Sequence, residues 1–278
     1  MADIFSRDGT RIACRSEGKG PPLVLVHGSG TDGGSWNPVL PSLVSAFTVI
    51  AMDRRGHGRS SDAQTYSIAR EYEDVIACID SAGGDPVDVA GHSYGGLCAL
   101  GAARAGGKVR RLILFEPPIP TYPEAYYPAD LIEKMTQALA ADDRDGAMVA
   151  FAKGVFGNSD EEIADMKKLV MWQQMARTSP RILRELKTVD NFVLKPEEYR
   201  GWNTPTLLLL GSESPPQYRA TIEALHAALP GSRIGVLEGQ QHSAMKTAPA
   251  LFAQTILDFL KPKRKRRRPL PHPEPGEG

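Results

Sequence analysis

A serine flanked by glycines stands where a strand pattern gives way to a helix pattern. Gly91-His92-Ser93-Tyr94-Gly95 follows the short β-type run 86–90 and precedes the small-residue run 97–104. A serine in a sharp turn between a strand and a helix presents its hydroxyl as a nucleophile, at a helix N-terminus that favours negative charge. We expect Gly91 and Gly95 to be required, because side chains there would collide with neighbouring chain.

A serine hydroxyl is a weak nucleophile at neutral pH and needs a base, for which histidine has a suitable pKa. We expect His92 to point away from its neighbour Ser93, His226 falls on a predicted helix, and His272 lies in a charged tail. The six histidines of the chain are His27, His57, His92, His226, His242 and His272.

The elements that would position these residues alternate between strand and helix. A hairpin is predicted at 2–6 and 11–17, and strands follow at 23–26, 47–52, 86–90, 109–115, 205–210 and 232–237. Helices are predicted near 38–45, 67–81, 97–104, 217–229 and 248–260. This order predicts an α/β fold with a mostly parallel sheet and helices on both faces. His27-Gly28, Asp53, Ser93 and Glu116 then lie at carboxyl ends of strands, where catalytic groups collect.

Between 119 and 200 the alternation stops, and helices are predicted at 129–141, 146–156, 160–178 and 180–189. We interpret 119–200 as a helical cap on a core made of 1–118 and 201–260. As a group its apolar residues predict an apolar roof, suited to a small apolar or aromatic acyl substrate. Those residues are Tyr126, Tyr127, Met135, Met148, Phe151, Phe156, Met171, Trp172 and Met175.

The end of the chain differs from the rest in composition. Residues 261–278 carry seven Lys/Arg and two Glu and are rich in proline, whereas the net charge of the whole chain is zero. Such a segment cannot bury enough apolar surface to fold, so we predict a disordered tail. Because it has no aromatic residue for stacking on bases, we expect no nucleic-acid partner.

Other features narrow the class of protein. The spacing of Cys14, Cys78 and Cys98 fits no metal site, and an odd number of cysteines suits a reducing compartment. No stretch approaches the ~20 apolar residues of a membrane span, and the first residues do not form a signal peptide. With no dinucleotide or phosphate-binding loop either, we expect a cytoplasmic protein without metal, cofactor or membrane association. The sequence does not indicate an oligomeric state.

Four motifs, taken in order, resemble the α/β-hydrolase fold family: His27-Gly28-Ser29-Gly30, residues 53–60, residues 91–96 and Gly239-Gln240-Gln241-His242. The resemblance covers residues ~1–260 and implies a serine hydrolase of the esterase type. It implies that Ser93 is the nucleophile and that His242 is its base, because the family carries its catalytic histidine after the last strand. It also implies an oxyanion hole made by the backbone N–H groups of Ser29 and Tyr94.

The resemblance leaves two candidates for the acid that orients the histidine. Many family members carry an aspartate three residues after the glycine that ends strand 205–210, where this chain has Ser214, with Glu213 one position away. Certain haloalkane dehalogenases resemble the chain in having a glutamate where Glu116 ends strand 109–115. A glutamate directly after a buried strand is costly unless it is paired. We therefore favour Glu116 and keep Glu213 as the alternative.

These residues predict hydrolysis of a carboxylic ester or a related acyl compound through an acyl-enzyme. Trp36 and Trp172 are expected to line the substrate pocket. A serine nucleophile disfavours haloalkane dehalogenase and epoxide hydrolase mechanisms. Lactonase, thioesterase, C–C hydrolase and cofactor-free lyase activities remain open on the same fold. So does a ligand-binding or receptor-type module with little turnover.

Overall fold

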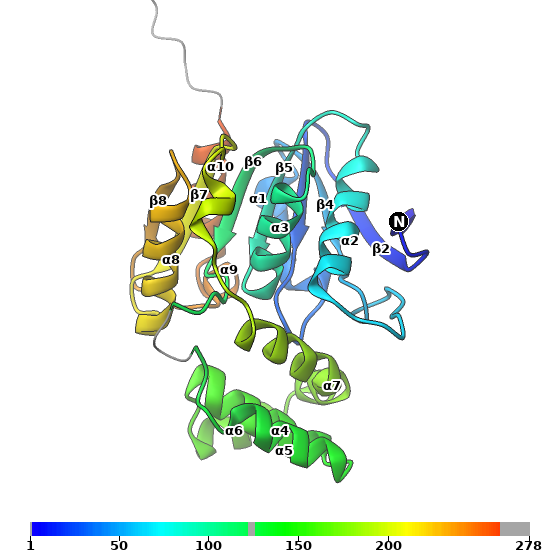
Figure 1. Cartoon of the computed structure of the whole chain (residues 1–278), viewed down its shortest axis with the longest axis vertical. Coiled ribbons are helices and arrows are strands. Elements are labelled where there is room, and N and C mark those ends of the chain that lie inside the picture. Colours follow the sequence, from blue (N-terminus) through cyan, green and yellow to red (C-terminus); the bar gives the residue numbers. More distant parts are fainter. Residues whose placement is uncertain (1, 122–125, 262–278) are drawn as a thin grey trace, which may run out of the picture.

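The computed structural model describes residues 2–121 and 126–261. Its centre is an eight-stranded sheet in the order β1-β2-β4-β3-β5-β6-β7-β8 (Figure 1). β2 pairs antiparallel with β1 and with β4, and the strands from β4 to β8 pair in parallel, as the sequence predicts. The strands are β1 (Ala2–Phe5), β2 (Arg11–Glu17), β3 (Pro22–Val26), β4 (Thr48–Met52), β5 (Val87–His92), β6 (Val109–Phe115), β7 (Thr206–Gly211) and β8 (Arg233–Leu237).

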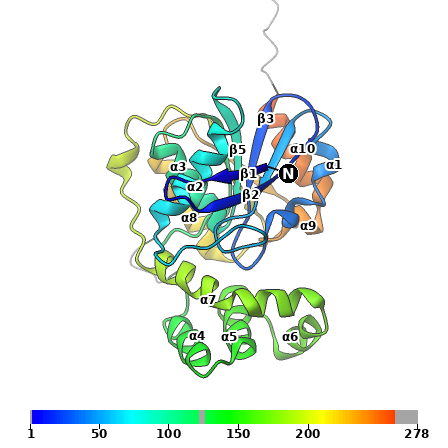
Figure 2. The same cartoon turned by 90° about the vertical axis from the view of Figure 1, so that its right-hand side faces the viewer.

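Helices cover both faces of the sheet, and Figure 2 shows the two layers on either side of it. One layer holds α2 (Ile68–Asp80), α3 (Tyr94–Arg104) and α8 (Pro216–Ala228), and the other holds η1 (Gly33–Trp36), α1 (Leu40–Leu43), α9 (Ala244–Thr247) and α10 (Pro249–Leu260). Alternate residues of β3 enter opposite cores: Val24 and Val26 face the first layer, and Leu23 and Leu25 the second. Because successive side chains of a strand point to opposite faces, continuous apolar runs fit this doubly covered sheet.

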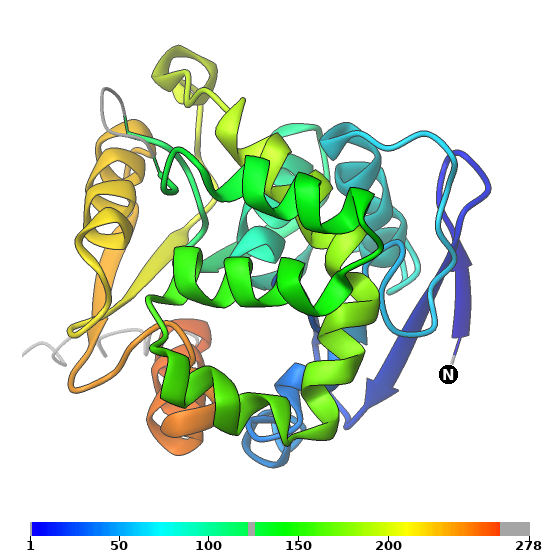
Figure 3. The ribbon, with the colours of Figure 1, turned by 90° about the horizontal axis from the view of Figure 1, so that it is seen from below.

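The helices between β6 and β7 lie beyond the carboxyl ends of the strands (Figures 1 and 3). They are α4 (Leu131–Ala140), α5 (Arg144–Phe151), the π-helix η2 (Ala152–Phe156), α6 (Asp160–Lys167) and α7 (Val170–Asp190), followed by the short η3 (Pro196–Tyr199). These helices, from α4 to α7, span 131–190 within the segment 119–200 that the sequence predicts as a cap, and from here on the cap means 131–190. It has an apolar core of its own that includes Met135, Met148, Trp172 and Ile182.

The division of the cap into helices differs from the prediction. The helix predicted at 160–178 is broken at 168–169, and α7 runs through Pro180 instead of restarting after it. Proline cannot donate the backbone hydrogen bond expected by the carbonyl four residues earlier. That carbonyl, on Ala176, accepts the Ser179 hydroxyl at 2.7 Å instead, so the helix continues.

Helix α7 is anchored on the core by buried charges. The Glu185 carboxylate accepts Arg54 Nη2 at 2.5 Å and His57 Nε2 at 2.8 Å, and all three side chains are fully buried. Burial alone would raise the pKa of Glu185, but the charges of Arg54 and His57 hold it well below its ordinary value. Nearer the surface, Asp62 pairs with Arg184 at 3.0 Å. These contacts fix where the cap sits over the strand ends.

Two further features bear on the predictions. Cys14, Cys78 and Cys98 are buried free thiols. Within 2–121 and 126–261, no helix has the length and apolarity needed to cross a membrane. Apart from Lys261, the predicted tail 261–278 lies outside the described residues.

Candidate active site

Ser93 occupies a strained turn between β5 and α3. Its backbone has φ 52° and ψ −130°, a region that normally favours glycine. The neighbouring glycines let the chain close around it. A Cβ on Gly91 would lie 2.5 Å from the Gly95 carbonyl oxygen, and a Cβ on Gly95 would lie 2.3 Å from the His27 carbonyl oxygen. The steric requirement predicted for both glycines is therefore confirmed.

Glu116 and His242 form a buried pair across the carboxyl end of β7, because Glu116 follows β6, His242 comes after β8, and β7 lies between these two strands. Glu116 directly follows β6, has a positive φ of 46° and is fully buried. Its Oε1 accepts the backbone N–H of Gly211 at 2.8 Å, and its Oε2 lies 2.7 Å from His242 Nδ1. Both carboxylate oxygens are thus engaged, which removes the cost of burying an unpaired charge.

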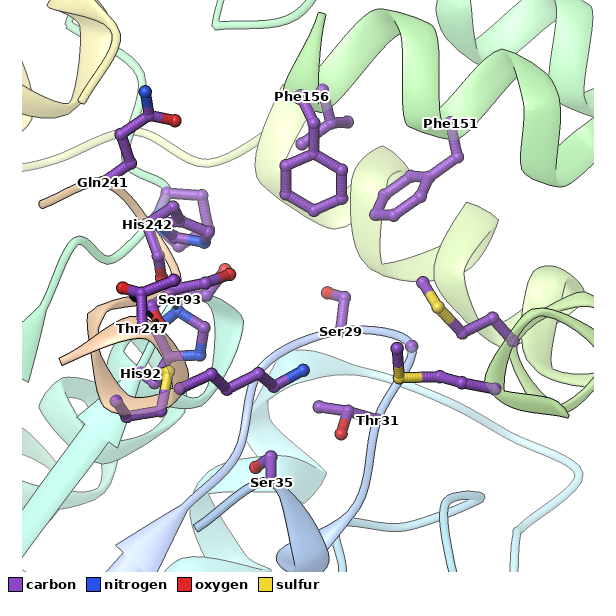
Figure 4. Close-up of a pocket in the computed structure, with 18 of the residues that line it drawn as sticks. Ser29, Thr31, Ser35, His92, Ser93, Phe151, Phe156, Gln241, His242 and Thr247 are labelled. Atoms are coloured by element: carbon purple, nitrogen blue, oxygen red, sulfur yellow. Dashed lines mark hydrogen bonds between the residues drawn. The ribbon is translucent and has the colours of Figure 1, made fainter. Parts of the chain in front are cut away.

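The pairing sets His242 against the serine turn. The Nε2–H of His92, the residue before Ser93, donates to the His242 carbonyl at 2.9 Å, and the two imidazole rings lie 4.5 Å apart. The Tyr218 ring also stacks on His242, with the ring centroids 4.6 Å apart and the ring planes at 22°. Ser93 and His242 both line one cavity, shown in Figure 4. Sequence reasoning missed Tyr218, because nothing in the pattern of α8 distinguishes it from a core residue.

The alternative acid, Glu213, lies elsewhere on the rim of this cavity. Its carboxylate is exposed, and its backbone N–H donates to the Gln240 carbonyl at 3.0 Å. His242 Nδ1 is already paired with Glu116. Of the two acids that the sequence left open, the structure brings only Glu116 into contact with His242.

The loop that carries Ser29 is held from behind by His27 and Arg54. The Gly28 carbonyl accepts His27 Nδ1–H at 2.7 Å and Arg54 Nη1 at 3.3 Å, while the Arg54 backbone N–H donates to His27 Nε2 at 2.9 Å. Burial lowers the pKa of His27 well below its ordinary value, so the ring is neutral and can accept at Nε2. Gly28 itself packs against the serine, since a Cβ there would lie 3.0 Å from Ser93 Cβ.

The two groups predicted for an oxyanion hole flank this contact. Ser29 follows Gly28 and lines the cavity, and Tyr94 begins α3, where backbone N–H groups have no acceptor within the helix. The Tyr94 side chain is buried, with its hydroxyl 2.6 Å from that of Tyr66. Only its backbone is therefore suited to contact a substrate.

The cavity has a volume of about 1160 Å³ and two chemically different sides. The cap contributes an apolar side, and the loop 29–38 and α9 contribute hydroxyl, amide and charged groups. In Figure 4, Phe151 and Phe156 lie across the cavity from Thr31 and Ser35. The apolar lining from the cap comprises Phe151, Val155, Phe156, Met166, Met171, Met175 and Leu186.

The expectation that Trp36 and Trp172 line the substrate pocket is wrong. Trp36 is 1% exposed and packs under the site, with its ring 6.4 Å from His92 and 6.1 Å from Phe252. Trp172 lies in the core of the cap, where its indole N–H donates to Asp145. On α7 the cavity is lined instead by Met171 and Met175, which lie one turn apart on the helix.

A sequence model described as the Alpha/beta hydrolase family matches residues 23–255. The chain belongs to this family. A crystal structure of an alpha/beta hydrolase from Sphaerobacter thermophilus shares 33% sequence identity and a TM-score of 0.81, covering 94% of this chain and 100% of its own. This chain is also similar to two curated enzymes, a hydrolase and an esterase, and this similarity indicates that it hydrolyses its substrate.

One is (E)-2-((N-methylformamido)methylene)succinate hydrolase of Acinetobacter baylyi, 25% identical over 247 residues that cover 88% of this chain and 92% of the relative. The other is pimeloyl-[acyl-carrier protein] methyl ester esterase of Neisseria meningitidis, 28% identical over 253 residues that cover 86% and 92% respectively. Because the two relatives act on different substrates, the likeness indicates a hydrolase and leaves the bond that it cleaves open.

Proposed function

We propose that this protein is a serine hydrolase that cleaves a carboxylic ester or a related acyl compound through an acyl-enzyme. The observation that carries the proposal is the buried Glu116–His242 pair, set by His92 against the strained turn of Ser93. A carboxylate on Nδ1 holds the imidazole with its Nε2 lone pair free to take a proton. The similarity to an esterase supports an acyl substrate.

The reaction follows from these positions. Ser93 Oγ attacks the acyl carbon while His242 Nε2 accepts its proton, and the new oxyanion is bound by the backbone N–H groups of Ser29 and Tyr94. Collapse breaks the bond to the leaving alcohol, which His242 protonates. Water then attacks the acyl-enzyme with His242 again as base, which frees the acid and restores Ser93. Glu116 stabilises the imidazolium at each proton transfer.

The cavity favours a substrate with an apolar part. Seven cap residues form its apolar side, and its volume of about 1160 Å³ exceeds what a short acyl chain fills. We therefore expect the acyl or alcohol part to lie against Phe151, Phe156 and the methionines of α7. Esters fit this arrangement best, and lactones and thioesters remain within the same chemistry.

The test is hydrolysis of p-nitrophenyl esters from acetyl to long acyl chains by the wild type and by Ser93→Ala. Ser45→Ala is the matched control, because Ser45 is an exposed serine that does not line the cavity. We expect turnover to depend on Ser93 and not on Ser45. Labelling by a fluorophosphonate reports an activated serine independently of substrate. If the wild type showed no turnover of any ester and Ser93 were not labelled, the proposal would be refuted in favour of a binding module.

A further inference from the structure

The cavity is also lined by a cation that forms no ion pair with an acidic side chain among residues 2–121 and 126–261. Lys246 lies on α9, four residues after His242, and its exposed side chain lines the cavity. Across the described residues no ion pair includes its ammonium group. Three lysines of the cap differ from Lys246 in this respect, because Lys153, Lys167 and Lys168 each pair with an aspartate. An ammonium group that lines a cavity without an ion-pair partner is available to an anion on a bound molecule.

Lys246 stands in the helical turn that directly follows His242, because its backbone N–H donates to the carbonyl of Ser243 at 2.7 Å. Burial is the main reason why the pKa of His92 lies well below its ordinary value, and the nearby His242 and Lys246 lower it further. His242, Ser243 and Lys246 all line the cavity, so Lys246 belongs to the end of the cavity that holds the catalytic histidine. An anion held there would be part of the same molecule as the bond that is cleaved.

The helix that carries Lys246, α9, packs against η1, which carries Ser35, so polar groups of the loop 29–38 belong to the same side of the cavity. Thr31 and Ser35 face the cavity on the side away from Phe151 and Phe156 (Figure 4). Their hydroxyls can donate hydrogen bonds to a carboxylate alongside the ammonium group.

Three other residues with charged side chains also line the cavity. Arg177 on α7 is a second cation. The carboxylate of Asp32 accepts the Gly34 N–H at 2.8 Å as the cap of η1, and Glu213 is exposed in the loop after β7. Of the two cations, Lys246 stands in the turn that directly follows His242, whereas Arg177 lies on α7 of the cap, and this position singles out Lys246 for a contact close to the reacting bond.

We propose that Lys246 selects substrates that carry a carboxylate on the part of the molecule bound beside Ser93, with the apolar part against the cap. This inference rests on the proposed function, because it assigns a substrate class to the same site. The preferred substrate is then a monoester or other monoacyl derivative of a dicarboxylic acid, or an ester with an equivalent anionic group.

The experiment compares two p-nitrophenyl esters of similar length, the neutral valerate and the anionic hydrogen glutarate. Lys246→Met removes the charge and keeps the bulk of the side chain. The matched control is Lys19→Met, in the exposed loop between β2 and β3 at the opposite end of the sheet. A charge-assisted contact predicts a loss of about tenfold in kcat/KM for the glutarate and less than twofold for the valerate.

Charge reversal sharpens the test. Lys246→Glu should lower turnover of the glutarate further and should favour a p-nitrophenyl ester that carries a trimethylammonium group. Free glutarate should protect Ser93 from labelling by a fluorophosphonate, which gives a readout that does not depend on turnover. We expect this protection to be lost in Lys246→Met. A series of hydrogen esters from succinate to suberate should show one optimal length, set by the separation of Ser93 and Lys246.

Three results would overturn the proposal. Lys246→Met could lower kcat/KM equally for the two esters, or it could leave kcat/KM for the glutarate unchanged. The third is that the preference for glutarate over valerate is lost in Arg177→Met and kept in Lys246→Met. Each is distinct from failure of the proposed function. That failure would appear as valerate turnover independent of Ser93, or as no labelling of Ser93. Serine-dependent turnover of valerate without a preference for glutarate would refute only the role of Lys246.

Discussion

Replacing Glu116 with glutamine tests the pair on which the proposed mechanism depends. The structure dictates how the amide must be oriented. Gly211 N–H is a donor, so the amide oxygen of the new side chain has to take the place of Oε1, which accepts it at 2.8 Å. The amide NH₂ then faces His242 Nδ1, where the carboxylate now lies at 2.7 Å. Since an NH₂ group can only donate, His242 must carry its proton on Nε2, the atom that has to act as base.

The size of the effect follows from that tautomer. A neutral imidazole with its proton on Nε2 cannot accept the proton of Ser93, and the imidazolium loses its buried counter-charge. Enforcing the wrong tautomer in this way costs about 10⁴ in kcat, or about 5 kcal/mol in activation free energy. The glutamine keeps the volume of the side chain and the hydrogen bond to Gly211, so the fold should change little.

Steady-state hydrolysis of a p-nitrophenyl ester by Glu116→Gln and Glu213→Gln, side by side, is the assay. Glu213 is exposed on the rim of the same cavity and serves as the matched control, with an expected change of less than about threefold, as for a surface substitution. Circular dichroism and thermal unfolding establish that both variants are folded. If a folded Glu116→Gln enzyme retained most of its turnover, or if Glu213→Gln were the inactive variant, the assignment of the acid would be refuted.

Three further predictions concern stability and are measured by urea denaturation. Gly95→Ala should lower the free energy of unfolding by at least about 1–3 kcal/mol, because the new Cβ would lie 2.3 Å from the His27 carbonyl oxygen. Gly201→Ala is the control and should leave the free energy of unfolding nearly unchanged, because its Cβ would have no heavy atom within 4 Å. Glu185→Ala should cost about 3–5 kcal/mol by leaving Arg54 and His57 without their shared acceptor, and Glu185→Gln should cost less. Burial keeps His27 and His92 neutral in the native state, so only the unfolded chain takes up their protons near pH 6.5. The free energy of unfolding should therefore fall as the pH decreases below about 6.5, by up to about 1.4 kcal/mol per pH unit for each proton, and His92→Gln should have the shallower slope.

The core of the fold could be predicted from the sequence because its signals are local. Runs such as 23–26 and 205–210 are apolar at every position, or nearly so, which is what a strand covered on both faces requires, and the structure places them in β3 and β7. The glycines around Ser93 could be predicted for the same reason, since steric exclusion within a tight turn depends on a few adjacent residues.

The cap could be predicted only as a set of helices. Pro180 favours a helix boundary, but the Ser179 hydroxyl satisfies the carbonyl that proline leaves without a donor, and α7 continues. The phase of a helix relative to its neighbours also depends on packing that periodicity does not specify. Trp172 and Met171 are adjacent in sequence, yet the first is buried in the cap and the second lines the cavity.

The sequence favours Glu116 but leaves Glu213 open as the acid, because the choice depends on register between strands. Phe115 of β6 lies opposite Leu209 of β7, and the Glu116 N–H donates to the Leu209 carbonyl at 3.2 Å. Only this register brings the Glu116 carboxylate beside the Gly211 N–H and under His242. Spacing along the chain narrows the candidates to two, and the alignment of two strands selects between them.

The position of the acid also gives a physical reason for the serine at 214. A carboxylate at position 214 would compete with Glu116 for two donors. One is the single Nδ1–H of His242, which Glu116 accepts at 2.7 Å, and the other is the backbone N–H of Gly211 at the end of β7. The end of β7 is tightly packed, since a Cβ on Gly211 would lie 2.3 Å from the Gln240 carbonyl oxygen and 2.8 Å from Ser214 Oγ. Two carboxylates in this space would repel each other, and one would be left buried and unpaired. A glutamate after β6 and a small hydroxyl residue after β7 therefore belong to one arrangement, in which each favours the other.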